Sequence, residues 1–383
     1  MKKIILFLTG TRADFGKIKP LINIVRDSED FDLVIFGTGM HMLSKYGTTI
    51  NELRNSGYTE YLFTYINQME GDTMEVILSK TITGLSSYIN ENQVDMIVIH
   101  GDRIETLAGA ITGALRNKLV AHIEGGEVSG TIDDLIRHST SKLSHLHFIA
   151  NDNAKQRLLQ LGELESSLFN IGSPDIDIMY SKDLPTLEMA IERYELPFHE
   201  FAIAILHPVT TETDKQYEHA KMFVKMLKES GRNYIVVLPN NDMGAEYIFR
   251  AFDEDLKDIP NIKLFPSIRF EFFLSLLKHA QFIIGNSSSG IHEAPAYGVP
   301  TINIGTRQLN RFHYESIINV PFEEDRILNA IKTALEVKRY PKTNFYGDGT
   351  SAQKFINTLR MDAVWDTPKQ KVFQDLFVKH PGS

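Results

Sequence analysis

The most informative absence in this 383-residue sequence is cysteine, which does not occur at all. Disulfide bonds, thiolate metal sites and cysteine nucleophiles are therefore excluded. Long apolar runs are missing too, because no stretch approaches the roughly 20 apolar residues of a membrane span. The first letters, MKKIILFLTG, resemble a signal peptide, but the apolar run of roughly six residues is too short and no small-residue cleavage site follows. We expect a cytoplasmic protein that begins with a buried strand.

Positive charge is also in short supply. There are 40 Lys and Arg residues against 49 Asp and Glu residues, which gives a formal net charge of -9 at pH 7. This excess argues against nucleic acid or an anionic membrane as the main partner. A phosphorylated ligand is compatible with it, because local cations and helix N-termini hold phosphate against an unfavourable overall field.

Short apolar runs alternate with helical patterns along almost the whole chain. The runs are continuous, as in parallel strands that are buried on both faces. They are KIILFLT, FDLVIFGTG, VDMIVIHGD, KLVAHIEGG, HLHFIA and SLFNIGSP, then FAIAILHP, NYIVVLPN, NIKLFPS, AQFIIGNSSSG and VPTINIGT. Residues 72–92 and 103–118 carry apolar side chains at helical spacing between them. This alternation is typical of a doubly wound α/β sheet, and it restarts after a polar stretch near 181–200.

We therefore predict an α/β protein of two Rossmann-like doubly wound domains that face a cleft. The length supports two domains. The expected bounds are 1–172 and 173–352, with a helical segment, 353–383, joining the first domain. Ligands of open parallel sheets bind beyond the carboxyl ends of the strands. The polar motifs TGTRADFGK, HGDR, HIEGGE, LHPVT, LPNND, GNSSSG and GTRQ all follow predicted strands, so we expect their loops to converge on the cleft.

Three serines between two glycines, in GNSSSG (285–290), open a predicted helix. Small residues let backbone amides approach an anion, and Ser287 and Ser288 add hydroxyl donors, so the motif favours a phosphate site. The alternative is an ordinary N-cap, for which serine is a preferred residue. Glu293 follows within the helix, either as a partner for a ribose hydroxyl or as a solvent-facing side chain.

Cations follow two other predicted strands. Arg12 and Lys17 lie in TGTRADFGK, and Arg307 lies in GTRQ. Arginine binds a phosphate through its planar fork and lysine as a point charge. The first motif is neither a Walker loop nor a GxGxxG fingerprint, and single cations of this kind are also common on ordinary surfaces.

HGDR places Asp102 and Arg103 directly after a very apolar strand, where a charged pair favours function. His207 stands at a strand end before a proline that fixes the turn, and by itself it is compatible with a structural role. The histidines of RHSTSKLSHLH do not have the spacing of a zinc motif, so we expect no metal ion. No GxSxG elbow is present, which argues against a serine hydrolase.

The densest group of carboxylates lies in HIEGGEVSGTIDD (122–134), which holds Glu124, Glu127, Asp133 and Asp134 among three glycines. One interpretation is a solvated turn. The other is acid–base chemistry, because carboxylates that crowd a cleft raise one another's pKa towards neutrality.

Taken together and in this order, these motifs resemble the UDP-N-acetylglucosamine 2-epimerase superfamily, and within it the hydrolysing branch that makes N-acetylmannosamine for sialic-acid synthesis. The match runs from TRADFGK through HGDR, HIEGGEVSGTIDD and HPVTT to GNSSSG and GTRQ. Non-hydrolysing members carry TRPE, GDT and EAGLRT at the corresponding places, where this sequence reads TRAD, GDR and EGGEVS. The resemblance implies a GT-B-like fold, no metal and no redox cofactor, a UDP-sugar substrate and a homo-oligomer, either a dimer or a tetramer.

The resemblance also implies roles for individual residues. The first domain is expected to carry the catalytic carboxylates and the second to bind UDP. The catalytic group consists of Asp102, Glu124, Asp133 and His207, with Glu127 beside Glu124 to orient or tune it. The UDP-binding group consists of Arg12, Asp14, Lys17, Arg103, Asn240, Ser287, Ser288, Glu293 and Arg307. Gly16 is a departure, because some relatives carry a serine there near the phosphates.

Inversion at C2 of an N-acetyl sugar requires a base on one face of the ring and an acid on the other. The hypothesis is anti elimination of UDP to a 2-acetamidoglucal, followed by addition of water. One alternative is the same reaction on UDP-2,4-diacetamido-2,4,6-trideoxy-glucose, which differs only at C4 and C6 of the sugar. A retaining GT-B glycosyltransferase would share the phosphate site but has no need of a base at C2, and a non-enzymatic nucleotide-sugar sensor would need no acid–base group.

Overall fold

The structure is a computed structural model that describes residues 2–44, 47–69, 71–129, 132–239, 243–308 and 311–375. Its contacts divide the chain into two compact units. The first contains the chain up to Glu127, Asp133–Asp177 and everything from Gly347 onward, and the second consists chiefly of Ile178–Tyr346. None of the helices in these described parts combines the length and apolarity that a membrane crossing needs.

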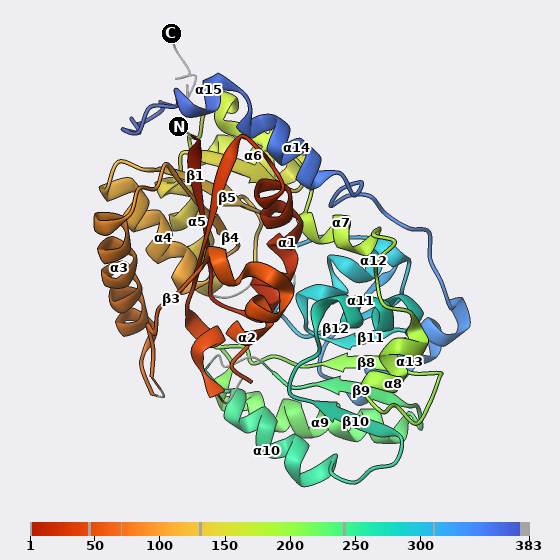
Figure 1. The fold of residues 1–383 in the computed structure, drawn as a ribbon. Coiled ribbons are helices and arrows are strands. Elements are labelled where there is room, and N and C mark those ends of the chain that lie inside the picture. Colours follow the sequence, from red (N-terminus) through yellow and green to blue (C-terminus); the bar gives the residue numbers. More distant parts are fainter. Residues whose placement is uncertain are drawn as a thin grey trace, which may run out of the picture. The chain divides into compact units, whose positions relative to one another are not determined.

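The first unit is built on a seven-stranded sheet in the order β3-β2-β1-β4-β5-β6-β7 (Figure 1). Its strands are β1 (Lys3–Thr9), β2 (Phe31–Gly37), β3 (Leu62–Thr64), β4 (Met96–His100), β5 (Leu119–Ile123), β6 (Leu146–Ile149) and β7 (Leu168–Asn170). Its helices are α1 (Arg12–Arg26), α2 (Ile50–Leu53), α3 (Met74–Glu91), α4 (Ile104–Leu115), α5 (Ile132–Leu143), α6 (Asp152–Gln160), α14 (Ser351–Leu359) and α15 (Asp362–Trp365). The strand pairs are parallel, with Ile5 of β1 opposite both Leu33 of β2 and Met96 of β4.

The second unit repeats this plan with six strands in the order β10-β9-β8-β11-β12-β13, again paired in parallel. Its strands are β8 (Ala202–Ile205), β9 (Tyr234–Val237), β10 (Ile262–Phe265), β11 (Ile283–Gly285), β12 (Thr301–Ile304) and β13 (Ile317–Val320). Its helices are α8 (Leu187–Arg193), α9 (Gln216–Glu229), α10 (Ala245–Asp255), α11 (Phe270–His279), α12 (Glu293–Tyr297) and α13 (Glu324–Val337). The short helix α7 (Pro174–Met179) contains the point at which the chain passes from the first unit to the second.

The prediction of two doubly wound parallel α/β sheets is confirmed, as is every strand expected from the apolar runs. The continuous runs are explained by burial on both faces. Ile5 and Phe7 of β1 belong to a cluster with α1 and α14, whereas Leu6 and Leu8 belong to a cluster with α3 and α4. Successive side chains of a strand point to opposite faces, so a strand that is covered on both sides needs apolar residues without interruption.

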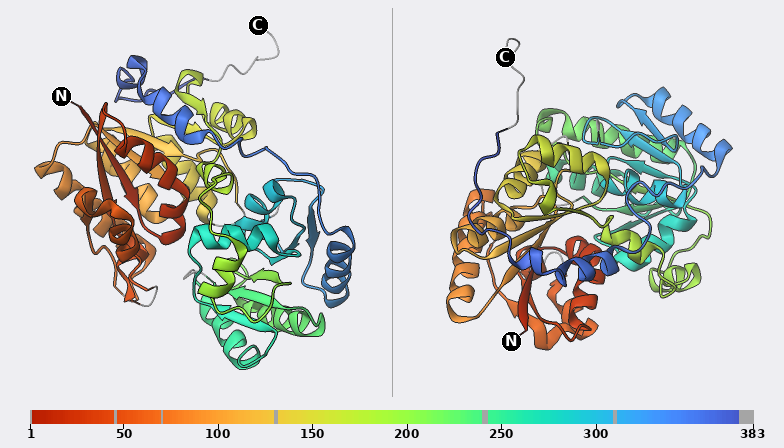
Figure 2. Two further views of the ribbon diagram at one scale, coloured as in Figure 1. Left: turned by 45° about the vertical axis from the view of Figure 1, so that its right-hand side comes forward. Right: turned by 90° about the horizontal axis from the view of Figure 1, so that it is seen from above.

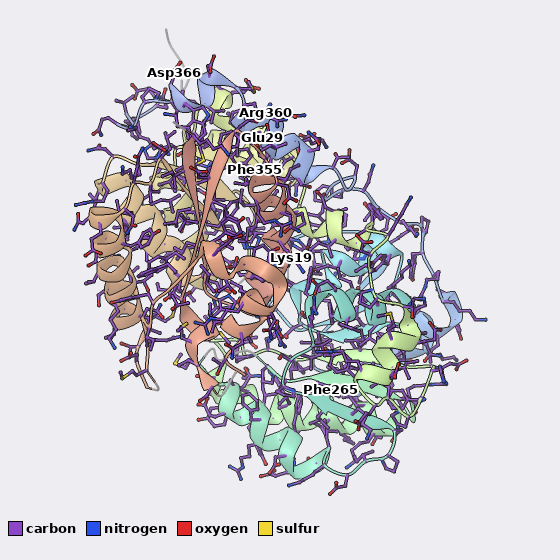
Figure 3. All side chains as sticks on the ribbon, in the orientation of Figure 1. Lys19, Glu29, Phe265, Phe355, Arg360 and Asp366 are labelled. Atoms are coloured by element: carbon purple, nitrogen blue, oxygen red, sulfur yellow. The ribbon has the colours of Figure 1, made fainter. Side chains whose placement is uncertain are left out.

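The carboxyl-terminal segment completes the core of the first unit (Figure 2). The ring of Phe355 in α14 lies 4.7 Å from that of Phe148 and 6.3 Å from that of Phe7. Phe355 and Arg360 are labelled in Figure 3. Arg360 follows this helix, and its Nε donates to Asp30 Oδ2 at 2.8 Å. The indole of Trp365 in α15 stacks on Phe31 at 5.9 Å. The last described helices are therefore structural members of a sheet domain whose strands come from the start of the chain.

We predict that Phe355→Ala lowers the free energy of unfolding of the first unit by about 3–5 kcal/mol, because it leaves a cavity between β1, β6 and α14. Urea unfolding followed by fluorescence measures this directly, since the single tryptophan of the chain, Trp365, lies in the same unit. Phe373→Ala is the matched control, because Phe373 is 82% exposed, and it should change stability by no more than about 0.5 kcal/mol. Equal urea midpoints for the two variants would contradict the packing role of α14.

Candidate active site

Each sheet reverses its strand order once, and the polar motifs lie at the reversal. In the first sheet the reversal falls between β1 and β4, and in the second between β8 and β11. Ligand sites of doubly wound sheets form at such a point, beyond the carboxyl ends of the strands. In each unit a hydrogen-bonded pair links the carboxyl ends of these two strands: Asp14, after β1, with His100, the last residue of β4, and His207, after β8, with Asn286, after β11.

Arg137 of α5 ties together the carboxyl ends of β4 and β5. Its guanidinium is buried, Nη2 donates to Asp102 Oδ2, and Nη1 donates to the backbone oxygen of Glu124 at 2.8 Å. Burial lowers the pKa of Arg137, but the surrounding carboxylates, first among them Asp102, raise it by more, so the side chain is a permanent cation. One buried arginine thus fixes the positions of two residues that the sequence assigns to catalysis.

The backbone at Glu124 is held in a strained conformation. Its φ is +60°, in the left-handed region that non-glycine residues rarely adopt, at a cost of order 1–3 kcal/mol. Its N–H donates to the oxygen of Phe148 at 2.9 Å, and Arg137 holds its carbonyl. Gly126 also has a positive φ, of +78°, and a Cβ there would lie 2.5 Å from the oxygen of Ala154. The glycines of HIEGGE therefore allow the tight turn that presents Glu124.

Both carboxylate oxygens of Glu124 are engaged. Oε2 lies 3.2 Å from His100 Nε2, and Oε1 accepts from the hydroxyl of Ser173. The other ring nitrogen of His100, Nδ1, lies 2.8 Å from Asp14 Oδ1. Burial lowers the pKa of His100, but the charge of Glu124 and the hydrogen bond with Asp14 outweigh it and raise the pKa to about 9. The crowded carboxylates expected from the sequence are thus interleaved with two cations, an imidazolium and a guanidinium.

The remaining acidic residues of the predicted catalytic group lie around this centre. Glu127 is buried and its Oε1 accepts from Asn151 Nδ2 at 2.6 Å. Asp133 lies in the first turn of α5 and is partly exposed. The negative charges of both residues contribute to the raised pKa of Arg137, which shows that they lie within electrostatic reach of it.

The cations that the sequence assigns to phosphate binding are paired with carboxylates of their own unit. Arg12 Nε donates to Glu52 Oε2 at 2.8 Å, and its Nη2 contacts the other oxygen of the same carboxylate. Lys17 Nζ donates to Asp175 Oδ2 at 3.0 Å, and Asp175 is fully buried. Arg103, which the resemblance also assigns to UDP binding, is farther from its carboxylate, with Nε 3.7 Å from Glu105 Oε2.

Asn286 organises the site of the second unit. Its side chain accepts from the N–H of His207 at 2.6 Å and donates to the oxygen of His207 at 2.8 Å. Its own backbone oxygen accepts from Arg307 Nη1 at 3.2 Å and from Gln308 Nε2 at 3.0 Å. Desolvation lowers the pKa of His207 to about 3, helped by the positive charge of Arg307, so this histidine is neutral at physiological pH. Asn286 thereby joins the loops after β8, β11 and β12.

The serine motif forms a tighter turn than expected. Residues Ser288–Gly290 make a single 3₁₀ turn, which Ser287 caps by accepting from the N–H of Ser289 at 3.3 Å, and α12 begins only at Glu293. The predicted helix opening at residue 285 is therefore wrong in detail, because the chain completes a 3₁₀ turn first. Glu293 is fully buried, so its interpretation as a solvent-facing side chain is wrong. Asn240, expected near the nucleotide, lies outside the described residues.

Several residues that organise the site were missed by the sequence reasoning. They are His100, Arg137, Ser173, Asn286 and Gln308. Signals existed for His100, which immediately precedes GDR, and for Asn286, which lies inside GNSSSG. Ser173 and Arg137 carried no comparable signal, because their partners Glu124 and Asp102 lie 49 and 35 positions away.

The histidines of RHSTSKLSHLH have structural partners instead. His147 Nε2 lies 3.0 Å from Glu163 Oε2, and His145 Nδ1 accepts from the N–H of Val120 at 3.1 Å. Among the residues that the structure describes, no group of three or more His, Asp or Glu side chains is arranged to hold a metal ion.

We predict that Asn286→Ala lowers the free energy of unfolding by about 1–3 kcal/mol, because it leaves the buried backbone groups of His207 without their partners. Urea unfolding followed by circular dichroism measures the effect. Asn261→Ala is the matched control, since the side chain of the partly exposed Asn261 makes a solvent-exposed hydrogen bond, from Nδ2 to the oxygen of Arg232 at 2.6 Å, and its loss should cost no more than about 0.5 kcal/mol. A cost for Asn286→Ala no larger than that of the control would refute the organising role.

Comparisons with known proteins agree with this arrangement. Residues 23–360 match the family model described as UDP-N-acetylglucosamine 2-epimerase. A Neisseria meningitidis serogroup B protein named UDP-N-acetylglucosamine 2-epimerase is 46% identical over 377 residues, which cover 98% of this chain and 99% of the relative. The UDP-N,N'-diacetylbacillosamine 2-epimerase (hydrolyzing) of Legionella pneumophila is 31% identical over 363 residues, covering 94% and 96%.

Among solved structures, the UDP-GlcNAc 2-epimerase of Methanocaldococcus jannaschii, in complex with UDP-GlcNAc and UDP, aligns with a TM-score of 0.78. The alignment covers 93% of this chain and 99% of that one, at 21% identity, a level at which the likeness shows a shared fold. The family model and the 46% identical relative each span nearly the whole chain. This protein therefore belongs to the UDP-N-acetylglucosamine 2-epimerase family.

Proposed function

We propose that this protein is a hydrolysing 2-epimerase that converts UDP-N-acetylglucosamine and water into N-acetylmannosamine and UDP, a step towards sialic acid. The observation that carries the proposal is the placement of Asp102 and Glu124 at the carboxyl ends of adjacent strands, both held by Arg137. Ionised, oriented carboxylates are what proton transfer at a carbon requires. The 46% identical relative bears the name of this substrate.

The proposed reaction has two steps. A base removes the proton from C2 of the sugar, the electron pair of that C–H bond forms a C1=C2 double bond, and the C1–O bond breaks so that UDP leaves with its electrons. The product is 2-acetamidoglucal. Water then adds across the double bond, its oxygen bonding to C1 and a proton reaching C2 from the opposite face. Each positioned acid or base contributes about 10²–10⁴-fold to such a reaction.

The acid–base work is assigned to Asp102, Glu124, Asp133 and His207, with Glu127 as an orienting group. Asp102 is tied to the permanent cation Arg137, which favours its ionised form. His207 is neutral, because desolvation lowers its pKa to about 3, and a neutral imidazole offers one hydrogen-bond donor and one acceptor. Its imidazole can therefore orient the sugar or a water molecule at physiological pH.

Binding of UDP is assigned to Arg12, Asp14, Lys17, Arg103, Asn240, Ser287, Ser288, Glu293 and Arg307. Arg12 and Lys17 hold carboxylates in the structure, so a diphosphate would replace Glu52 and Asp175 as their partner. The negative charge that develops on the leaving diphosphate is best stabilised by fixed donors of this kind. Arg307 is already fixed by its bond to the oxygen of Asn286.

A second candidate is the same reaction on UDP-2,4-diacetamido-2,4,6-trideoxy-glucose. The 31% identity to the hydrolysing enzyme of Legionella pneumophila favours it, because that protein is named for a diacetamido sugar. The acid–base requirement at C2 is unchanged, and the two substrates differ only at C4 and C6. The higher identity to the Neisseria meningitidis relative places N-acetylglucosamine first.

We predict that the protein, incubated with UDP-N-acetylglucosamine in deuterated water, releases UDP together with N-acetylmannosamine that carries deuterium at C2. Proton NMR shows this as loss of the C2 proton signal in the product. N-acetylmannosamine incubated with the protein alone is the control for later exchange. Release of UDP with hydrogen retained at C2 would rule out the elimination, and turnover of the diacetamido sugar alone would select the second candidate.

We predict that Glu124→Gln lowers kcat by about 10²–10⁴-fold while leaving the Kd for UDP within a factor of about two, because a neutral amide cannot exchange a proton but fills the same space. Coupled assay of UDP release and isothermal titration calorimetry give the two quantities. Glu165→Gln is the matched control, because Glu165 is an exposed residue whose carboxylate pairs with Lys155 at 2.7 Å, and it should leave both quantities unchanged. A collapse of UDP affinity in Glu124→Gln would show that Glu124 is a binding group and not a proton-transfer group.

A further inference from the structure

The proposed reaction assigns no role to His100. It is the last residue of β4, it is buried, and its imidazole spans two carboxylates, with Nδ1 2.8 Å from Asp14 Oδ1 and Nε2 3.2 Å from Glu124 Oε2. A neutral imidazole has one N–H, whereas two ionised carboxylates only accept hydrogen bonds. Both contacts are hydrogen bonds to ionised carboxylates only if His100 is an imidazolium.

The two carboxylates are themselves anchored to the scaffold. Asp14 lies in the first turn of α1, where its Oδ2 accepts from the N–H of Gly10 at 3.2 Å and its own N–H donates to Thr11 Oγ1 at 3.1 Å. Glu124 is held at the other end by Ser173 on its Oε1 and by Arg137 on its backbone oxygen. His100 is therefore a bridge between two fixed points, and the Glu124 side chain cannot rotate without breaking it.

Charged side chains lie on the elements around this bridge. They are Asp14 and Lys17 on α1, Asp102 after β4, Glu105 on α4, Glu124 and Glu127 after β5, Asp133 and Arg137 on α5, and Asp175 on α7. His122 of the adjacent strand β5 is neutral, because burial lowers its pKa to about 3. His100 contacts the carboxylates of Asp14 and Glu124, whereas Arg137 contacts the carboxylate of Asp102 and the backbone oxygen of Glu124.

We propose that His100 is a positioning residue of the epimerisation, whose imidazolium keeps Glu124 ionised and in a single orientation for proton transfer. This inference rests on the proposed function of Glu124. His100 itself does not exchange a proton with the sugar; it acts through Glu124, and Asp14 acts through His100.

The role predicts a particular pH dependence. An opposite charge within about 4–6 Å lowers a carboxyl pKa by about 1–3 units, so a carboxylate that loses a neighbouring imidazolium ionises only at higher pH. The acid limb of the pH profile of kcat/KM in His100→Gln then moves about 1–3 pH units upward. Glutamine retains one donor and similar volume, so a purely structural role would lower activity at every pH without moving the limb.

His122→Gln is the matched control. His122 lies on the neighbouring strand, is equally buried, and hydrogen-bonds to Ser141 and to the oxygen of Gly101, but it carries no charge. Its replacement perturbs the same sheet and should leave the acid limb where it is. The proposal would be overturned if the acid limb of the kcat/KM profile did not shift in His100→Gln, or if it shifted equally in both variants.

A second measurement does not depend on turnover. In the unliganded protein the Hε1 proton of His100, assigned as the NMR signal that is missing in His100→Gln, should titrate near pH 9. Asp14→Asn removes one of the two carboxylates and should move that midpoint downward while the chain stays folded. A wild-type midpoint at or below 6.5, the ordinary histidine value, would refute the imidazolium even in a protein that turns over neither nucleotide sugar.

The same titration has a consequence for stability with a defined sign. Because the folded-state pKa of His100 lies above its unfolded value, its contribution to stability is complete below about pH 6.5 and is lost as pH rises through about 9. The urea midpoint of the wild type should therefore fall towards that of His100→Gln between these pH values. Parallel profiles for the two proteins across that range would contradict the inference.

Discussion

The constraint on which this molecule depends is the single reversal of strand order in each parallel sheet. Chain connections leave on opposite sides of the sheet at that point, and the ends of β1 and β4, or of β8 and β11, are left side by side with no helix between them. One polar pair links the carboxyl ends of these strands in each unit, His100 with Asp14 in the first and His207 with Asn286 in the second. The two units therefore link the ends of these strands with different groups. The first uses an imidazole and a carboxylate, and the second uses an amide side chain and the backbone of a histidine.

The buried charged side chains of the first unit need partners to be stable. Buried charges are stable only when they are paired and their remaining hydrogen-bonding positions are filled, and loss of one partner leaves the other uncompensated. Here Arg137 hydrogen-bonds to Asp102 and to the backbone oxygen of Glu124, and His100 hydrogen-bonds to Asp14 and to the Glu124 carboxylate. Cations and carboxylates alternate through the cluster, so it remains ionised without mutual repulsion. The strained backbone at Glu124 persists because bonds from three directions hold it.

Periodicity predicted most of the fold, whereas the candidate site residues came from polar motifs at strand ends and from the family resemblance. A strand buried on both faces has an unbroken apolar run in the sequence. The strands β3 and β13 lie at sheet edges, have three and four residues, and show no such run, so they were not predicted. Asp102 and Glu124 were predictable because they follow apolar strands directly. His100 was not, since a histidine that ends a buried strand looks structural until its partner is known, and Asp14 lies 86 positions away. Pairings of that range are set by topology and have no local signature. The 3₁₀ turn at Ser288–Gly290 was missed because a serine cap suits either kind of turn.

The helices α14 and α15 pack on the first sheet, although they follow the second unit in the sequence. During synthesis the first unit is therefore completed after the second. Phe355, Ile356, Leu359 and Val364 belong to the core around β1 and α1, whereas the core cluster of the second unit runs, among the described residues, from Ala202 to Ala334. During synthesis, the sheet of the first unit therefore keeps an uncovered hydrophobic face while the core residues of the second unit are being made. Nascent chains expose this face until α14 and α15 have left the ribosome, which makes it the natural place for a chaperone to act.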